Sequence, residues 1–194
     1  MAGPRPLRAD ARRNRDLLLE AAVAAFSRDP DTEVTLDAIA KAAGVGIGTL
    51  YRHFPTREAL VEAAYRNELG KLCDSAGDLL ATLPPDRAVR AWMDHFVDYM
   101  TTKRGMAAAL QAVIASGGDP FAQSRTRMVA AITTLLTAGA AAGTVRADVD
   151  PADLLTSLSG VTLAAGQPAQ RDQAGRLLDL LLDALRYQPQ PQTR

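Results

Sequence analysis

The stretch that decides the fold runs from Thr35 to Phe54 and reads TLDAIAKAAGVGIGTLYRHF. Its first half repeats apolar residues at i, i+3, i+4 and i+7, which is the spacing of one helix face. Thr35 stands where a hydroxyl can cap a helix start, and Gly44 stands where a left-handed residue can end one. Pro55 disfavours helical geometry just before it, which limits a second helix to residues 47–54. The stretch therefore predicts a helix-turn-helix.

The second helix of this stretch is too short to be stable alone in water, so it must be held by packing and present its outer face. Leu50 and Phe54 are four residues apart and are expected to point into the core together. The outward positions are Gly48, Thr49, Arg52 and His53, with Tyr51 at the margin. None is an acid, and their polar groups can donate hydrogen bonds to phosphate oxygens. A helix of this size fits the DNA major groove, so the pattern favours a DNA-facing helix.

The segment 35–60 resembles the DNA-binding signature of the TetR family of transcriptional regulators. The matching phrases are AGV at 43–45, GTLY at 48–51, HF at 53–54 and REAL at 57–60. So many ordered positions with the right helix punctuation make a specific motif. The resemblance extends over residues 12–66, and the rest of the chain resembles the family in length and helical pattern only.

The resemblance implies a role for each matching position. The residues expected to touch the phosphate backbone are Thr35, Thr49, Tyr51, His53 and Arg57. Those expected to lie nearest the bases are Ile47, Gly48 and Arg52. Gly46 stands where many members have Ser or Ala, and it offers no side-chain cap. Two positions stay open, because Ile47 could instead be a core residue and Tyr51 could bury its ring while its hydroxyl reaches outward.

Charge is distributed locally rather than overall. The chain has 194 residues, of which 47% are hydrophobic and 23% charged, and its formal net charge is zero. A DNA-binding protein needs only a local positive region. Residues 5–15 supply one, with Arg5, Arg8, Arg12, Arg13 and Arg15 against Asp10. We expect residues 1–11 to form a basic flexible arm that contacts DNA or, alternatively, a solubilising tail.

The whole chain reads as helical. No segment alternates with period two, and capping residues and first-turn prolines divide the chain into nine helices. The expected spans are 12–28, 36–43, 47–54, 57–81, 86–102, 105–115, 120–142, 151–165 and 170–186. We therefore predict an all-α, nine-helix, two-domain protein. Its parts are the arm at 1–11, a helix-turn-helix DNA-binding domain at 12–56, a helical effector-binding and dimerisation domain at 57–188, and a tail at 189–194.

The last two expected helices carry more leucine than a one-sided surface helix needs, which predicts contact on two sides. Two such helices from each of two subunits would form a four-helix bundle, which also resembles the family's usual dimer. The alternative is burial within one subunit. The residues assigned to the dimer interface are Leu154, Leu158, Val161, Leu178, Leu181, Leu182 and Leu185.

The middle of the chain holds a candidate cavity. Trp92, Phe96 and Tyr99 lie at i, i+4 and i+7, and further apolar residues could converge on them. Those further residues are Met106, Leu110, Phe121 and Met128. Aromatic stripes at helical spacing are usually core, so a small-molecule pocket and an ordinary core both remain open, with the family resemblance favouring the pocket.

Catalytic motifs are missing from the sequence. There is no Gly-x-Ser-x-Gly, His-Glu-x-x-His or P-loop pattern. Cys73 is the only cysteine, so an internal disulfide or Cys-based metal site is excluded. We expect no enzyme activity, catalytic residue, metal or cofactor. Neither an apolar leader nor a long uncharged apolar run is present, so we expect a cytoplasmic protein with no membrane partner.

These patterns favour a ligand-responsive DNA-binding transcriptional regulator. We expect a repressor that binds a palindromic double-stranded operator as a homodimer and is released by a small-molecule effector of unknown identity. The alternatives are a DNA-binding protein without an effector and a helical protein of another class, including an enzyme, on the same scaffold.

Overall fold

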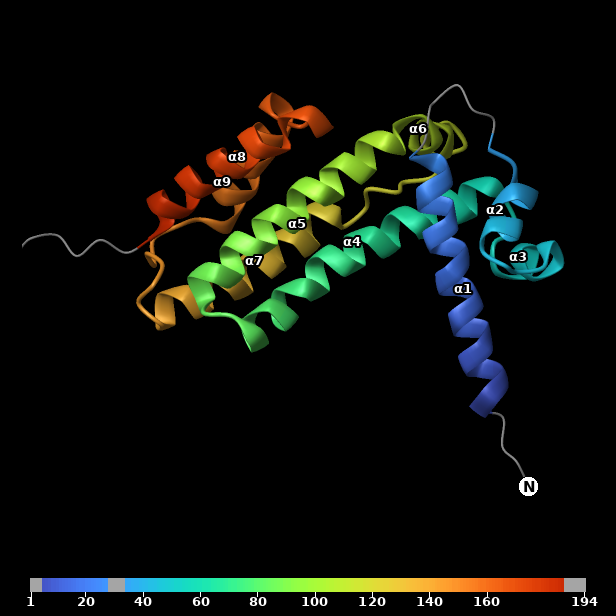
Figure 1. The fold of residues 1–194 in the computed structure, drawn as a ribbon, viewed down its shortest axis with the longest axis horizontal. Coiled ribbons are helices and arrows are strands. Elements are labelled where there is room, and N and C mark those ends of the chain that lie inside the picture. The colour runs from blue at the N-terminus through green and yellow to red at the C-terminus, as the bar shows by residue number, and fades with distance from the viewer. Residues whose placement is uncertain (1–4, 28–33, 187–194) are drawn as a thin grey trace, which may run out of the picture. The chain divides into compact units, whose positions relative to one another are not determined.

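A computed structural model of the chain describes residues 5–27 and 34–186, with side chains from Ala9 onward. The described part is all-α (Figure 1), as expected. Its helices are α1 (Arg5–Phe26), α2 (Leu36–Ala42), α3 (Ile47–His53), α4 (Arg57–Thr82), α5 (Pro85–Gly105), α6 (Ala107–Ala115), α7 (Ser124–Ala141), α8 (Pro151–Ala164) and α9 (Arg171–Leu185), with a 3-10 turn, η1 (Pro168–Gln170).

Two of the expected helix starts were wrong. The first helix begins at Arg5 rather than at residue 12, so residues 5–11 are helical where a flexible arm was expected. Pro6 is compatible with this because a first-turn residue has no intrahelical partner for its missing N–H group. The seventh helix begins at Ser124 rather than at residue 120, because Gln123 adopts a left-handed conformation with φ 65°. The other boundaries lie within three residues of the expected ones.

Contacts divide the chain into two compact units. The first comprises Met1–Glu68 and Thr102–Pro120, and the second comprises Leu69–Thr101 and Phe121–Arg194. The helices α4 and α5 therefore each contribute residues to both units.

The first unit closes a small core around α1, α2 and α3. Leu18, Ala22 and Phe26 of α1 are buried, as are Ile39, Leu50 and Phe54. The burial of Leu50 and Phe54 confirms that they point into the core together, as their spacing predicts. The core holds α3 in place even though it has only seven residues.

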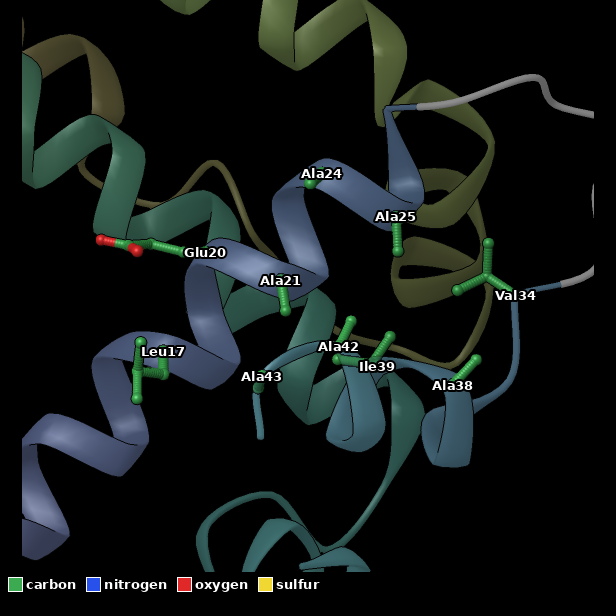
Figure 2. Close-up of a pocket in the computed structure, with 10 residues that line it drawn as sticks. All are labelled: Leu17, Glu20, Ala21, Ala24, Ala25, Val34, Ala38, Ile39, Ala42 and Ala43. Atoms are coloured by element: carbon green, nitrogen blue, oxygen red, sulfur yellow. The ribbon is translucent and has the colours of Figure 1, made fainter. Parts of the chain in front are cut away.

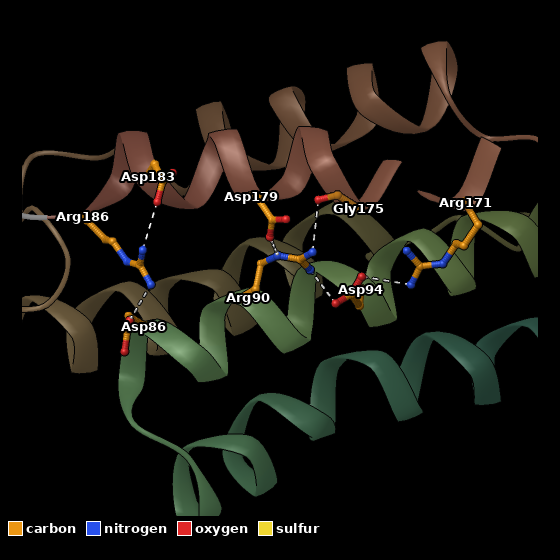
Figure 3. Close-up of polar contacts among 8 residues, drawn as sticks. All are labelled: Asp86, Arg90, Asp94, Arg171, Gly175, Asp179, Asp183 and Arg186. Atoms are coloured by element: carbon orange, nitrogen blue, oxygen red, sulfur yellow. Dashed lines mark hydrogen bonds and ion pairs between the residues drawn. The ribbon is translucent and has the colours of Figure 1, made fainter. Parts of the chain in front are cut away.

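The second unit is held by apolar packing and by a line of ion pairs. The helix α8 packs against both α7 and α9. Arg90 of α5 donates hydrogen bonds to Asp179 Oδ1 at 2.7 Å and to the carbonyl oxygen of Gly175 at 3.1 Å, both on α9 (Figure 3). Arg90 also forms an ion pair with Asp94 of α5. Asp94 Oδ1 accepts a further hydrogen bond from Arg171 of α9 at 2.9 Å. These bonds fix the register of α9 along α5.

Candidate nucleic-acid interface

The turn between α2 and α3 is a Schellman motif. Gly44 has φ +65°, and its N–H group donates to the carbonyl oxygen of Lys41 at 3.1 Å. The N–H group of Val45 donates to the carbonyl oxygen of Ala40 at 2.9 Å. These two bonds satisfy carbonyl groups that the end of α2 would otherwise leave unpaired, and the left-handed glycine reverses the chain. The turn therefore sets the direction in which α3 leaves α2.

Threonine side chains cap the helices on either side of α3. Thr35 Oγ1 accepts a hydrogen bond from the Ala38 N–H group at 3.2 Å at the start of α2. Thr56 Oγ1 does the same for Ala59 at 3.1 Å at the start of α4. Thr35 is exposed, so the cap leaves a helix N-terminus accessible to an anion. As expected, no side-chain cap is present at Gly46.

The outer surface of α3 is accessible and carries no acid. Leu50 is fully buried and anchors the helix. Tyr51 is 50% exposed and Ile47 is 37% exposed, so neither is a core residue. The DNA contacts assigned to Ile47 and Tyr51 stay predictions, and about half of the Tyr51 surface is covered by the protein. Arg52 is also exposed, so α3 presents a phenol, an aliphatic group and a guanidinium together.

Gly48 leaves the centre of this surface flat. It is exposed, and a Cβ atom built on it would meet nothing within 4 Å outside its immediate neighbours. The fold therefore does not require a glycine at this position. A position without a side chain does allow another molecule to approach the backbone of α3 closely.

The remaining candidate contacts are partly covered by the protein. Thr49, His53 and Arg57 are half-buried. The Arg57 guanidinium lies over the ring of Phe26 at 4.7 Å from its centroid. A phosphate contact through Arg57 stays a prediction, because part of this side chain is used in packing.

The contact of Arg15 with an aromatic ring was not predicted from the sequence. The Arg15 guanidinium lies 5.7 Å from the centroid of the Phe54 ring, and Phe54 is the residue that caps the C-terminal end of α3. The only signal in the sequence was its place in the arginine-rich segment. Which aromatic ring it would meet depends on the angle between α1 and α3.

A pocket of about 440 Å³ lies between α1 and α2 in the same unit (Figure 2). Six of its lining residues are alanines, and Leu17, Val34 and Ile39 supply larger aliphatic groups. Glu20 is its one ionisable lining residue, and in Figure 2 its carboxylate points away from the alanines. The pocket is thus an aliphatic groove between the two helices that position α3.

The residues expected to line an effector pocket fall into both units. Trp92, Phe96 and Tyr99 belong to the second unit and are buried. The ring centroids of Trp92 and Phe96 are 6.0 Å apart, and those of Phe96 and Tyr99 are 6.4 Å apart. Trp92 Nε1 also donates to the Leu72 carbonyl oxygen at 2.9 Å. This packing supports the core alternative for the stripe. The other candidates are Met106 and Leu110, buried in the first unit, and Phe121 and Met128, half-buried in the second.

Most of the leucines assigned to a dimer interface are buried within a single chain. Leu154, Leu158, Leu178, Leu182 and Leu185 are all buried in the monomer, while Val161 and Leu181 are half-buried. The five buried side chains therefore correspond to the alternative of burial within one subunit. The accessible leucines of α8 and α9 are different ones: Leu163 is 88% exposed and Leu180 is 66% exposed.

Reactive groups give no sign of catalysis. Burial raises the pKa of the Cys73 thiol, which opposes formation of the nucleophilic thiolate. Within residues 5–27 and 34–186, no group of three or more His, Cys, Asp or Glu side chains is placed to hold a metal ion. No helix in that part of the chain is long and apolar enough to cross a membrane.

Two family models match the chain. Residues 18–64 match the model described as bacterial regulatory proteins of the tetR family, and residues 84–187 match the C-terminal domain of SbtR-like transcriptional regulators. No curated protein sequence matches the chain significantly.

Solved structures agree with the family models. The TetR transcriptional regulator SCO0520 from Streptomyces coelicolor is 55% identical, with 90% of this chain and 99% of that chain covered and a TM-score of 0.85. A TetR regulatory protein from Mycobacterium vanbaalenii is 35% identical over 94% of this chain and 100% of its own, with a TM-score of 0.75. The chain belongs to the TetR family of DNA-binding transcriptional regulators.

Proposed function

We propose that this regulator is a repressor that binds a palindromic operator as a homodimer and is released by a small-molecule effector. The accessible, acid-free surface of α3 carries the proposal. Arg52 would read a base edge, Ile47 would contact a thymine methyl group, and Gly48 would let the backbone approach the groove. Thr35, Thr49, Tyr51, His53 and Arg57 would hold the phosphate backbone.

A homodimer follows from the small size of α3. Seven residues contact too few bases for useful specificity, whereas two copies about one DNA turn apart can read two half-sites. The accessible leucines Leu163 and Leu180 on α8 and α9 would take part in the interface, because large apolar side chains this exposed are candidates for burial between subunits. The DNA-binding domain would span residues 12–56, and residues 57–188 would bind the effector and dimerise.

Release by an effector is a linkage between two sites. The effector would bind better to a dimer whose two α3 helices are placed wrongly for the operator, and it would therefore lower the affinity for DNA. By reciprocity, DNA would lower the affinity for the effector by the same factor. The half-buried Phe121 and Met128 are the members of the expected pocket that remain partly accessible.

DNA binding is tested with the purified full chain. Genomic fragments that it retains would be sequenced, and the affinity for the shortest such fragment measured by fluorescence anisotropy at several salt concentrations. Binding should weaken steeply with salt, because phosphate contacts release counterions. Arg52→Gln should change the preference among fragments, Tyr51→Ala should weaken all of them alike, and Arg87→Gln on the exposed part of α5 should do neither. Failure to retain any fragment would overturn the proposed function.

The effector is tested by a thermal-shift screen of metabolites against the full chain. A true effector raises the melting temperature by mass action and also lowers affinity for the retained fragment. If no compound does both, release by a small-molecule effector is overturned.

A further inference from the structure

The first turns of α1 extend beyond the three-helix core. In Figure 1 the N-terminal part of α1 continues past the level of α2 and α3. Every described residue from Ala9 to Arg13 is exposed, and Leu18 is the first fully buried residue of the helix. Residues 9–13 therefore contribute nothing to the core of their own unit, although they belong to the same helix.

The arginines of this segment have the spacing of one helix side. Arg5, Arg8, Arg12 and Arg15 follow each other at i, i+3, i+7 and i+10. Arg13 is the exception, since one residue corresponds to a rotation of about 100° around the helix from Arg12. The structure describes the side chains of Arg12 and Arg15, and we call these two residues the arginine stripe.

The arginine stripe lies on the side of α1 that faces the reading helix. Leu19 follows Arg12 by seven residues and Arg15 by four, so all three share a side, and Leu19 is fully buried in the core. Arg15 confirms this orientation, because its guanidinium lies over Phe54 at the C-terminal end of α3. The stripe thus continues from the end of α3 along the projecting turns of α1.

The arginine stripe takes part in no ion pair between described residues. None of the ion pairs between described residues includes Arg12, Arg13 or Arg15. Two acids lie on the same segment, Asp10 and Asp16. Asp16 is four residues from Arg12 and offsets part of the charge, but the arginines remain in excess.

The helical conformation limits how this segment can meet DNA. An extended basic arm could enter a minor groove, which is about 6 Å wide, whereas a helix with its side chains is about 10–12 Å across. The projecting turns therefore cannot enter a minor groove, and with α3 in the major groove they would lie along the adjacent sugar-phosphate strand. Ten residues of helix rise about 15 Å, which is long enough for guanidinium groups to meet several successive phosphates.

We propose that the arginine stripe of α1 is a second DNA-contacting element, which clamps the phosphate backbone next to the groove occupied by α3. This rests on the proposed operator binding and adds a contact that carries no sequence information. The stripe would raise affinity for every DNA sequence by the same factor, while α3 decides which sequence is preferred.

The test compares Arg12→Gln with Arg13→Gln, which remove the same charge from adjacent exposed positions. Glutamine keeps a good helix propensity, so helix content by circular dichroism should not change. Arg12→Gln should weaken binding of the dimer about thirtyfold at 0.15 M salt and reduce the salt slope by about 1.8, because one phosphate contact is lost in each subunit. The loss should be equal on the retained genomic fragment and on unrelated DNA of the same length. Arg13→Gln should bind as the unchanged chain does.

A double variant, Arg12→Gln with Arg15→Gln, enlarges the effect and should reduce the salt slope by about 3.6, because two phosphate contacts are lost in each subunit. The proposal is overturned if this variant keeps the original slope, or if Arg13→Gln matches Arg12→Gln on both DNAs. If this variant keeps the original salt slope while Tyr51→Ala still weakens binding, only the proposal for the arginine stripe is rejected. The proposal of operator binding then still stands. If the unchanged chain binds no DNA, both proposals fail together.

Discussion

The helices α3 and α9 both carry apolar residues at helical spacing, yet they use them differently. In α3 one fully buried leucine, Leu50, anchors a helix whose other side is accessible. In α9 four residues are buried by the same chain, Ala174, Leu178, Leu182 and Leu185, while Leu180 is 66% exposed. Spacing identifies residues that share a face, but it does not identify which chain covers that face.

The polar contacts sharpen this difference. Arg90, Asp94 and Arg171 join α5 to α9 beside the buried apolar face of α9. The side chain of Arg90 is largely covered, and it satisfies two carboxylates and a backbone carbonyl. In contrast, Arg52 of α3 is exposed, and Gly48 beside it leaves open space. Polar groups on α9 hold the fold together, whereas those on α3 remain available for a partner.

The largest expected effect separates the two kinds of leucine on α9. Leu178→Ala should lower the free energy of unfolding by about 2–5 kcal/mol, because it leaves a cavity at a fully buried position. Leu180→Ala should change it by less than about 0.5 kcal/mol in the separated subunit. Urea unfolding at low protein concentration measures both. Equal losses for the two variants would contradict the burial of α9 within one chain.

The next effect concerns the ion pairs of α9. Arg90→Ala should lower the free energy of unfolding by about 1–2 kcal/mol, a modest value because Asp179 is largely exposed. Arg90→Lys should recover only part of this, since an ammonium group cannot bond Asp94, Asp179 and Gly175 in the same fork geometry. Arg176→Ala, at an exposed position of α9, is the control and should have little effect. No loss in Arg90→Ala would mean that these pairs do not fix α9.

The smallest expected change in stability comes from Gly48→Ala, which should also weaken DNA binding. Gly48→Ala should raise the free energy of unfolding by about 0.5–1 kcal/mol, since alanine favours a helix and its methyl group meets open space. The same variant should weaken DNA binding, because that methyl group would stand between α3 and the groove. Gly77→Ala in α4 also meets open space, and it should give the stability gain without the binding loss. Unchanged binding by Gly48→Ala would remove Gly48 from the DNA contact.

Much of the first unit could be predicted because its signals are local. Thr35 caps α2, Gly44 takes the left-handed conformation, and Leu50 with Phe54 anchors α3, as the spacing indicated. Each of these depends on backbone geometry within a few residues. Membership of the TetR family followed from the same short segment and is confirmed by the family models.

Contacts between residues far apart in the sequence could not be predicted from the spacing of apolar residues. Nothing in the spacing of α9 distinguishes a leucine covered by its own chain from one left for another molecule. The arginine segment before Leu18 could be an arm or a helix by composition, and the structure continues α1 through it from Arg5. Likewise, the aromatic stripe around Trp92 could line a pocket or fill a core until its neighbours were placed.

The sequence by itself determined the helices, their caps, the turn at Gly44 and the polar character of the outer side of α3. Only the tertiary structure decided that Leu178 is buried while Leu180 is exposed, and that Arg15 lies over Phe54. The physical reason is that capping and periodicity act over three or four residues along the chain. Burial depends on which distant helix occupies the space beside a side chain.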